Sequence, residues 1–143
     1  MACPYFIPEQ RCDAELWQHR ARLPLGDGYN GFCCAQGETP YRPTQDELRA
    51  FCNIGYAKTC PRLPENRDAD SVRFMARAAA DGFVSVTYLM ERGHAPVSHG
   101  ELRYDPAHAA WSAPHPDQRV QSKAQCYLES YLAQHPAAAR ATK

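Results

Sequence analysis

The sequence has no long hydrophobic run and no excess of charge of either sign. No apolar segment approaches the ~20 residues that span a membrane, and the first residues, MACPY, contain neither the charged nor the apolar region of a signal peptide. Sixteen basic residues balance sixteen acidic ones, so nothing favours nucleic acid or an anionic membrane as a partner. The 143 residues are expected to form one soluble, cytoplasmic domain.

The sequence also lacks the motifs of common active sites. The glycine-rich stretch GDGYNG, residues 26–31, precedes no helical pattern and has no lysine to bind phosphate. Glu91 and Glu101 are candidates for a carboxylate pair across a hairpin, although two exposed charges on a sheet face are more common. The sequence leaves enzymatic activity open and favours a protein that is not an enzyme.

Cysteine is the residue that the sequence has in unusual number and position. Six of the seven cysteines lie in the first 60 residues, namely Cys3, Cys12, Cys33, Cys34, Cys52 and Cys60. In a reducing compartment, clustered cysteines more often bind metal or act in catalysis than pair as disulfides. The odd total also argues against a fully paired disulfide framework.

The spacing of the cysteines leaves several interpretations open. The C-x₂₋₄-C pairs of most structural zinc sites are absent, whereas iron–sulfur clusters accept more widely spread ligands. Cys60 followed by Pro61 has the form of a last cluster ligand, so we favour a 4Fe–4S cluster over zinc. Disulfides would need an oxidising compartment, and burial as small hydrophobic residues would account for one or two cysteines.

The first half of the chain, residues 1–66, is expected to form a loop-rich, cysteine-rich lobe. The stretch RLPLGDGYNGFCC, residues 22–34, predicts a folded loop rather than a helix or a strand. Residues 9–20 are a candidate helix. Because loops bury little apolar surface to offset the entropy of ordering them, we expect a cross-link through the cysteines to stabilise this lobe.

One helix in this lobe has a clear start signal. In TQDELRAFC, Thr44 and Glu47 form a capping box, which predicts a helix that Gly55 ends. Cys52 then lies near its last turn, and Cys60 lies in the loop that follows.

Residues 67–135 are expected to form a small antiparallel sheet and a C-terminal helix. Apolar residues alternate over 72–76 and 84–90, and Asp81-Gly82 lies between them, so the pattern predicts a hairpin, although MARAAA also suits a helix. A second turn is expected over 93–96.

The last element has helical spacing of its apolar residues and Asp117 as its N-cap. Cys126 lies opposite the apolar stripe of this helix, so it is expected to face solvent or to touch a second surface. Residues 136–143 are expected to be a flexible tail. The fold class is therefore α+β, with the cysteine lobe packed on the sheet and the helix.

The cysteine segments also carry a resemblance. CPYF, LPLGDGYNGFC and FCNIGYAKTCPRLP resemble a family of small cysteine-rich bacterial proteins, and the similarity extends through HPDQRVQSKAQCYLESYL. The resemblance implies metal or iron–sulfur binding by Cys3, Cys34, Cys52 and Cys60. Either Cys33 or Cys12 is an alternative to Cys34, and the resemblance implies no particular activity.

Three histidines offer a second candidate for a metal site. His94, His99 and His115, together with Cys126, would supply its ligands, but histidines in turns are more often solvated or bound to the backbone.

The cysteines lead to the functional prediction. The sequence predicts a small 4Fe–4S protein that acts in electron transfer or redox sensing, with a redox or regulatory protein as its partner. The alternative is a structural or protein-binding module that zinc or the cluster stabilises, without redox chemistry.

Overall fold

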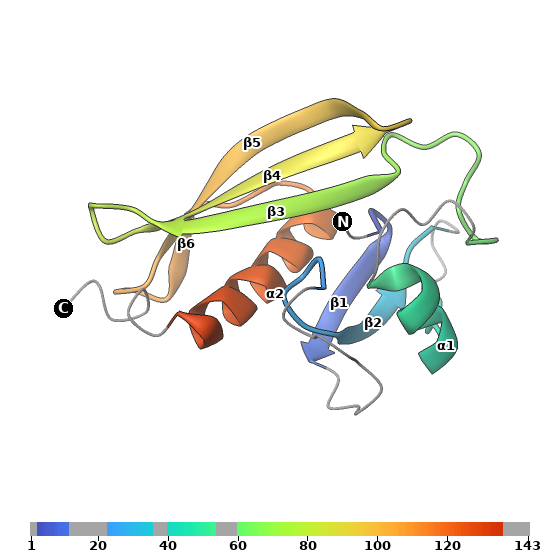
Figure 1. Cartoon of the computed structure of the whole chain (residues 1–143), viewed down its shortest axis with the longest axis horizontal. Coiled ribbons are helices and arrows are strands. Elements are labelled where there is room, and N and C mark those ends of the chain that lie inside the picture. The colour runs from blue at the N-terminus through green and yellow to red at the C-terminus, as the bar shows by residue number, and fades with distance from the viewer. Residues whose placement is uncertain (1–2, 12–22, 36–39, 54–59, 136–143) are drawn as a thin grey trace.

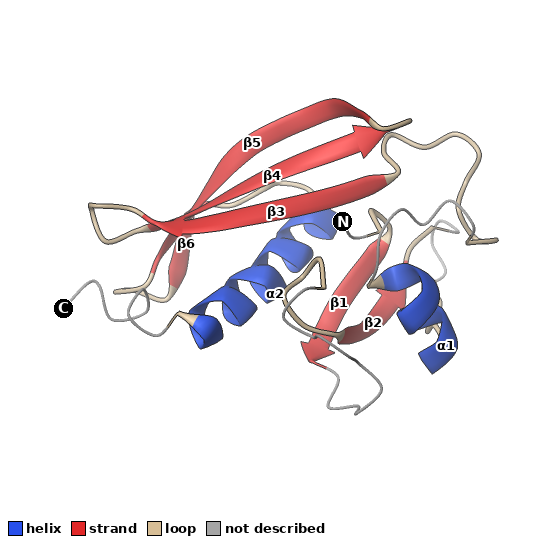
Figure 2. Ribbon diagram, viewed as in Figure 1, coloured by secondary structure: helices blue, strands red, loops and turns tan. Residues whose placement is uncertain are grey.

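The structure, a computed structural model, describes residues 3–11, 23–35, 40–53 and 60–135. It is an α+β fold in which a long helix lies between two antiparallel sheets (Figures 1 and 2). The elements are β1 (Phe6–Arg11), β2 (Tyr29–Cys33), α1 (Gln45–Glu47), η2 (Leu48–Cys52), β3 (Ser71–Ala78), β4 (Val84–Arg92), β5 (Ala95–Asp105), β6 (Ala110–Ala113) and α2 (Gln118–Gln134). The predicted fold class is confirmed.

The larger sheet has the strand order β3-β4-β5-β6. The predicted hairpin forms β3 and β4, and Gly82 takes a positive φ of 89° in its turn, which glycine adopts without steric cost. MARAAA begins inside β3 and is not helical, because alternate residues of the strand face the core. The fourth strand, β6, was not predicted, since four residues give too short an alternation to recognise.

Helix α2 follows the prediction closely. Asp117 caps it by accepting a hydrogen bond from the backbone N–H of Arg119 at 2.9 Å. Its apolar stripe packs on the inner face of the larger sheet, where Ala124 and Leu128 are fully buried in a core with Val84 and Val86. Burial of a side chain such as Leu128 contributes about 2 kcal/mol. None of the helices in the described residues is long and apolar enough to cross a membrane.

The opposite face of α2 packs on the small sheet of β1 and β2. Cys126 is buried there, and the hydroxyl of Tyr29 donates to the Cys126 carbonyl at 2.8 Å. The prediction that Cys126 touches a second surface is confirmed. Helix α2 therefore contributes to two cores, one shared with the larger sheet and one shared with the cysteine lobe.

The small sheet corrects two predictions for the cysteine lobe. The pattern of residues 22–34 predicts a loop, but 29–33 form β2, and residues 9–11 of the candidate helix 9–20 belong to β1. The glycine and proline residues made this strand pair hard to predict. The two strands approach each other closely at Gly31, beside a bulge that follows Pro8. The rest of the candidate helix and the predicted tail lie outside the described residues.

The capping box is confirmed. The hydroxyl of Thr44 accepts from the Glu47 N–H at 3.2 Å, and the Glu47 carboxylate accepts from the Thr44 N–H at 2.9 Å. The helix continues into one π-helical turn, η2, where the Asn53 N–H donates to the Leu48 carbonyl at 3.2 Å. Cys52 is its last residue, as expected, whereas Gly55 lies outside the described residues.

Candidate metal centre

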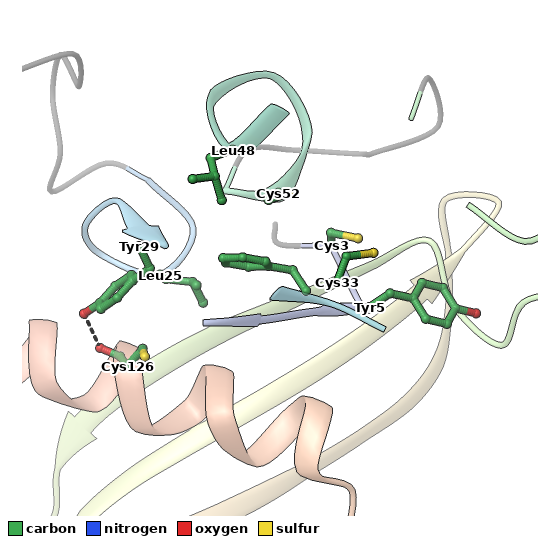
Figure 3. Close-up of a cluster of buried hydrophobic side chains, with 9 residues drawn as sticks. Cys3, Tyr5, Leu25, Tyr29, Cys33, Leu48, Cys52 and Cys126 are labelled. Atoms are coloured by element: carbon green, nitrogen blue, oxygen red, sulfur yellow. Dashed lines mark hydrogen bonds between the residues drawn. The ribbon is translucent and has the colours of Figure 1, made fainter. Parts of the chain in front are cut away.

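Four thiols come together at the end of the small sheet that faces η2. Cys3 precedes β1, Cys33 ends β2, Cys52 ends η2, and Cys60 begins the next described segment. Figure 3 shows the side chains of Cys3 and Cys33 pointing the same way, with Cys52 on the turn above them. We call Cys3, Cys33, Cys52 and Cys60 the four-thiol site.

The site is withdrawn from solvent. Cys3, Cys33 and Cys52 are 6–8% exposed and belong to one hydrophobic core, against which the half-buried Cys60 packs. Burial raises the pKa of each of these three thiols, because a thiolate loses solvation there.

The four thiols also lie close enough for their charges to interact. Burial raises the pKa of Cys52 most, followed by the charges of Cys3, Cys33 and Cys60. The charges of Cys33 and Cys60 also raise the pKa of Cys3, by less than burial does and by less than the Tyr5 hydrogen bond and Lys123 lower it. Deprotonating the whole set would therefore place repelling charges in a buried space. A bound cation would remove this repulsion, as it does wherever several thiolates share a metal.

Two backbone N–H groups are directed at the sulfur atoms. Ala35 donates to the Sγ of Cys33 at 3.4 Å, and a hydrogen bond from the backbone of Tyr5 opposes the rise in the pKa of Cys3. Hydrogen bonds of this kind favour the thiolate and are a usual second layer around metal-bound sulfur.

An aromatic and charged group holds the Cys60 segment near the other thiols. The guanidinium of Arg62 lies 3.3 Å from the ring centre of Tyr41 and 3.8 Å from the carboxylate of Glu47. Tyr41 is bridged to Cys33 through the backbone, and its hydroxyl donates to Glu47 at 2.6 Å. These contacts join the strand that carries Cys33, the helix that leads to Cys52, and the segment after Cys60.

Cys34 faces a different environment from its neighbour Cys33. Its Sγ donates to the Tyr5 carbonyl at 3.2 Å, and its charge interacts with Lys123 and Arg119 of α2. The charge of Cys34 acts on the Cys33 thiol, whereas the thiol charges that act most on Cys52 are those of Cys3, Cys33 and Cys60. The structure thus gathers Cys3, Cys52 and Cys60 of the implied ligand set and places Cys33 with them; Cys12 lies outside the described residues.

No three His, Cys, Asp or Glu side chains of the described segments are arranged around one point as ligands of a single ion. The residues supply four soft sulfur donors, which is the chemistry that zinc and iron–sulfur clusters require. The thiols would have to adjust their positions around a single ion.

The other predicted sites have ordinary surroundings. His115 packs edge-on against Tyr88, with ring centres 4.9 Å apart, while the Cys126 thiol faces the Pro8 carbonyl at 4.0 Å. The pairing of Glu91 with Glu101 is wrong, because the register of β4 and β5 places Glu101 opposite Thr87 and Glu91 opposite Pro96. Glu91 instead forms an ion pair with Arg73 at 2.9 Å.

Sequence reasoning missed the residues that surround the thiols. Tyr41 and Arg62 lie at distances from the cysteines that no pattern connects, and Lys123 lies in a helix 63 residues after Cys60. The sequence distinguishes Lys123 only as a charged residue among the uncharged buried positions of that helix.

Comparisons with protein-family models, with curated proteins and with solved structures found no match for this chain. The resemblance of the cysteine segments to a bacterial family therefore stays a prediction.

Proposed function

We propose that the four-thiol site binds a 4Fe–4S cluster and that the protein acts in electron transfer or redox sensing. The observation that carries the proposal is the convergence of four thiols from four separate segments into one buried space with interacting charges. A cluster held by four thiolates would cross-link the segments that carry β1, β2 and η2.

The preference for a cluster over a single ion rests on the wide spacing of the cysteines in the sequence. Around zinc, four sulfurs converge on one centre at about 2.3 Å, whereas in a 4Fe–4S cluster each cysteine binds a different iron, so the sulfurs lie farther apart. A bound zinc in a module without redox chemistry is the alternative outcome.

The proposal also includes a cellular compartment and a class of partner protein. Free thiols and an oxygen-sensitive cluster belong in a reducing compartment, which we take to be the cytoplasm. An electron carrier or sensor exchanges electrons with a second redox protein or signals to a regulatory one, and the balanced net charge of the chain favours neither nucleic acid nor an anionic membrane.

The first test is metal analysis of protein purified without oxygen. We expect a brown protein with about four irons and four sulfides per chain and a visible absorption that bleaches reversibly on reduction. One zinc per chain without colour would establish the alternative, and protein that retains no metal after reconstitution would contradict both.

Serine variants at adjacent positions identify the ligands. We expect Cys33→Ser to lose the cluster, as Cys3→Ser, Cys52→Ser and Cys60→Ser do, because each removes one thiolate. Cys34→Ser is the matched control and should keep full iron and sulfide content. Loss of the cluster in Cys34→Ser with retention in Cys33→Ser would restore Cys34 as the ligand.

A further inference from the structure

Lys123 is a fully buried lysine beside the four-thiol site. None of its surface is exposed, although it lies in the middle of α2 and carries a charged group. Its Nζ donates to the carbonyl of Pro4 at 3.0 Å and to the carbonyl of Arg119 at 2.8 Å. Pro4 directly follows Cys3, so this contact connects α2 with the residue next to a predicted ligand.

The ammonium group has carbonyl partners but lacks a carboxylate partner within the described parts of the chain. The acidic side chain whose charge reaches it, Asp117, forms its ion pair with Arg119 at 2.9 Å. Burial lowers the pKa of Lys123 to about 8, and the thiols of Cys3 and Cys34 oppose this change more than Asp117 does. The negative charge that best stabilises a protonated Lys123 is thus a thiolate.

A buried ammonium without a counter-charge destabilises a fold. The hydrogen-bond partners of the Lys123 ammonium, the carbonyls of Pro4 and Arg119, are neutral and supply no counter-charge. Metal binding reverses this situation, because it deprotonates the thiols, and four thiolates on a divalent ion or on a 4Fe–4S core leave a net negative charge.

We infer that Lys123 is the buried counter-charge of the four-thiol site and that the site is built for an anionic metal–thiolate centre. This inference rests on the proposed function. Lys123 is a positioning residue, since its Nζ contacts the backbone beside Cys3 and acts on the metal only through the thiolates. It balances the charge that appears beside Cys3 when metal binds.

The inference predicts opposite effects of one substitution on the metal-free and metal-bound protein. In Lys123→Met a side chain of similar length fills the same space without charge, so the metal-free protein should unfold at the wild-type temperature or above it. Its affinity for Zn²⁺, measured by competition with a chelator, should fall about tenfold or more, because the thiolates lose their counter-charge. If Lys123 had only a structural role, Lys123→Met would lower both the unfolding temperature of the metal-free protein and its affinity for Zn²⁺.

Two further variants complete the experiment. Lys123→Gln keeps a donor for the Pro4 carbonyl but not the charge, and it should lose Zn²⁺ affinity as Lys123→Met does. Arg119→Gln removes a cation one turn earlier, whose charge interacts with Cys34 rather than with Cys3, and it should bind Zn²⁺ within about threefold of wild type.

The outcomes separate this inference from the proposed function. Wild-type affinity in both Lys123 variants, or recovery in Lys123→Gln alone, would overturn the counter-charge while leaving the metal site in place. Metal-free variants that are both unfolded would also overturn it, because Lys123 would then be required by the fold itself. A wild-type protein that binds neither Zn²⁺ nor a reconstituted cluster would refute the site as a whole.

Discussion

At the scale of single residues, the carboxamide of Asn53 pairs with both backbone groups of Tyr29, as a neighbouring strand would. The Tyr29 N–H donates to its Oδ1 and its Nδ2 donates to the Tyr29 carbonyl, both at 2.9 Å, and Asn53 is fully buried. A third hydrogen bond, at 3.2 Å, joins Nδ2 to the Leu48 carbonyl. One side chain thereby docks η2, and Cys52 with it, on β2.

We expect Asn53→Ala to lower the free energy of unfolding by about 2–4 kcal/mol, because it leaves two buried backbone groups without partners. Urea denaturation measures the change. Asn30→Ala, beside Tyr29 on the same strand, is the control and should stay within about 0.5 kcal/mol of wild type. Equal losses in the two variants would show that the Asn53 pairing contributes nothing specific.

The thiol of Cys126 makes the free energy of unfolding depend on pH in the alkaline range. Burial raises the pKa of its thiol from 9.0 to about 12. The pKa of this thiol is therefore higher in the folded than in the unfolded protein. Its contribution to the free energy of unfolding is complete below pH 9, where the thiol is protonated in both states, and it is lost as pH rises from about 9 to about 12.

We therefore expect the free energy of unfolding of the metal-free protein to fall by about 1 kcal/mol from this thiol alone between pH 8 and pH 10. In Cys126→Ala the decline over that range should be smaller by this amount, whatever the stability at pH 8. Urea midpoints at several pH values test this, and parallel slopes for the two proteins would contradict it.

At the scale of elements, the β1–β2 pair depends on the close approach of two backbones. A Cβ at Gly31 would overlap the carbonyl oxygen of Ile7, and it would also lie 2.8 Å from the Cα of Pro8. Proline donates no hydrogen bond to the ladder, and a bulge follows it. Since β2 ends at Cys33, the geometry of this pair determines where that thiol lies.

We expect Gly31→Ala to lower the free energy of unfolding by about 2–3 kcal/mol or more, because backbone atoms have to move apart. It should also reduce the metal content of the protein. Gly93→Ala is the control: its φ of 58° makes alanine cost about 1 kcal/mol, but nothing lies near the added carbon, and the turn joins β4 and β5 of the larger sheet. Normal metal content in Gly31→Ala would separate the strand pair from the site.

At the scale of the whole molecule, α2 belongs to both cores and joins the cysteine lobe to the larger sheet. Tyr29, Ser130 and Cys126 form its hydrogen-bonded contact with the lobe, with the Tyr29 hydroxyl 2.5 Å from the Ser130 hydroxyl. A ligand that binds only the folded lobe should therefore stabilise the entire fold.

We expect metal removal to lower the unfolding temperature in a single calorimetric transition. A ligand at a thousand times its dissociation constant adds about 4 kcal/mol to the folded state. Calorimetry of the loaded protein and of the same protein after treatment with a chelator measures the difference. Two separate transitions, of which only one responds to the chelator, would show that the lobe and the sheet unfold independently.

Three elements with local signals could be predicted from the amino-acid sequence. The capping box of Thr44 and Glu47, the hairpin around Gly82 and the capped amphipathic helix after Asp117 are all present, because each depends on residues within a few positions of one another. The crowding of six cysteines into the first 60 residues likewise indicates, from composition and position alone, that the thiols are the groups to consider as ligands.

Which thiols lie together depends on contacts between segments that are distant in the sequence. The charge of Cys33 acts on Cys3 and Cys52, whereas the thiol of the neighbouring Cys34 donates to the Tyr5 carbonyl. The burial of Lys123 beside Cys3 joins residues 120 positions apart, and no periodicity encodes such a contact. The β1–β2 pair was likewise hidden, because its stability comes from packing against α2 and η2 rather than from the propensity of a short strand rich in glycine and proline.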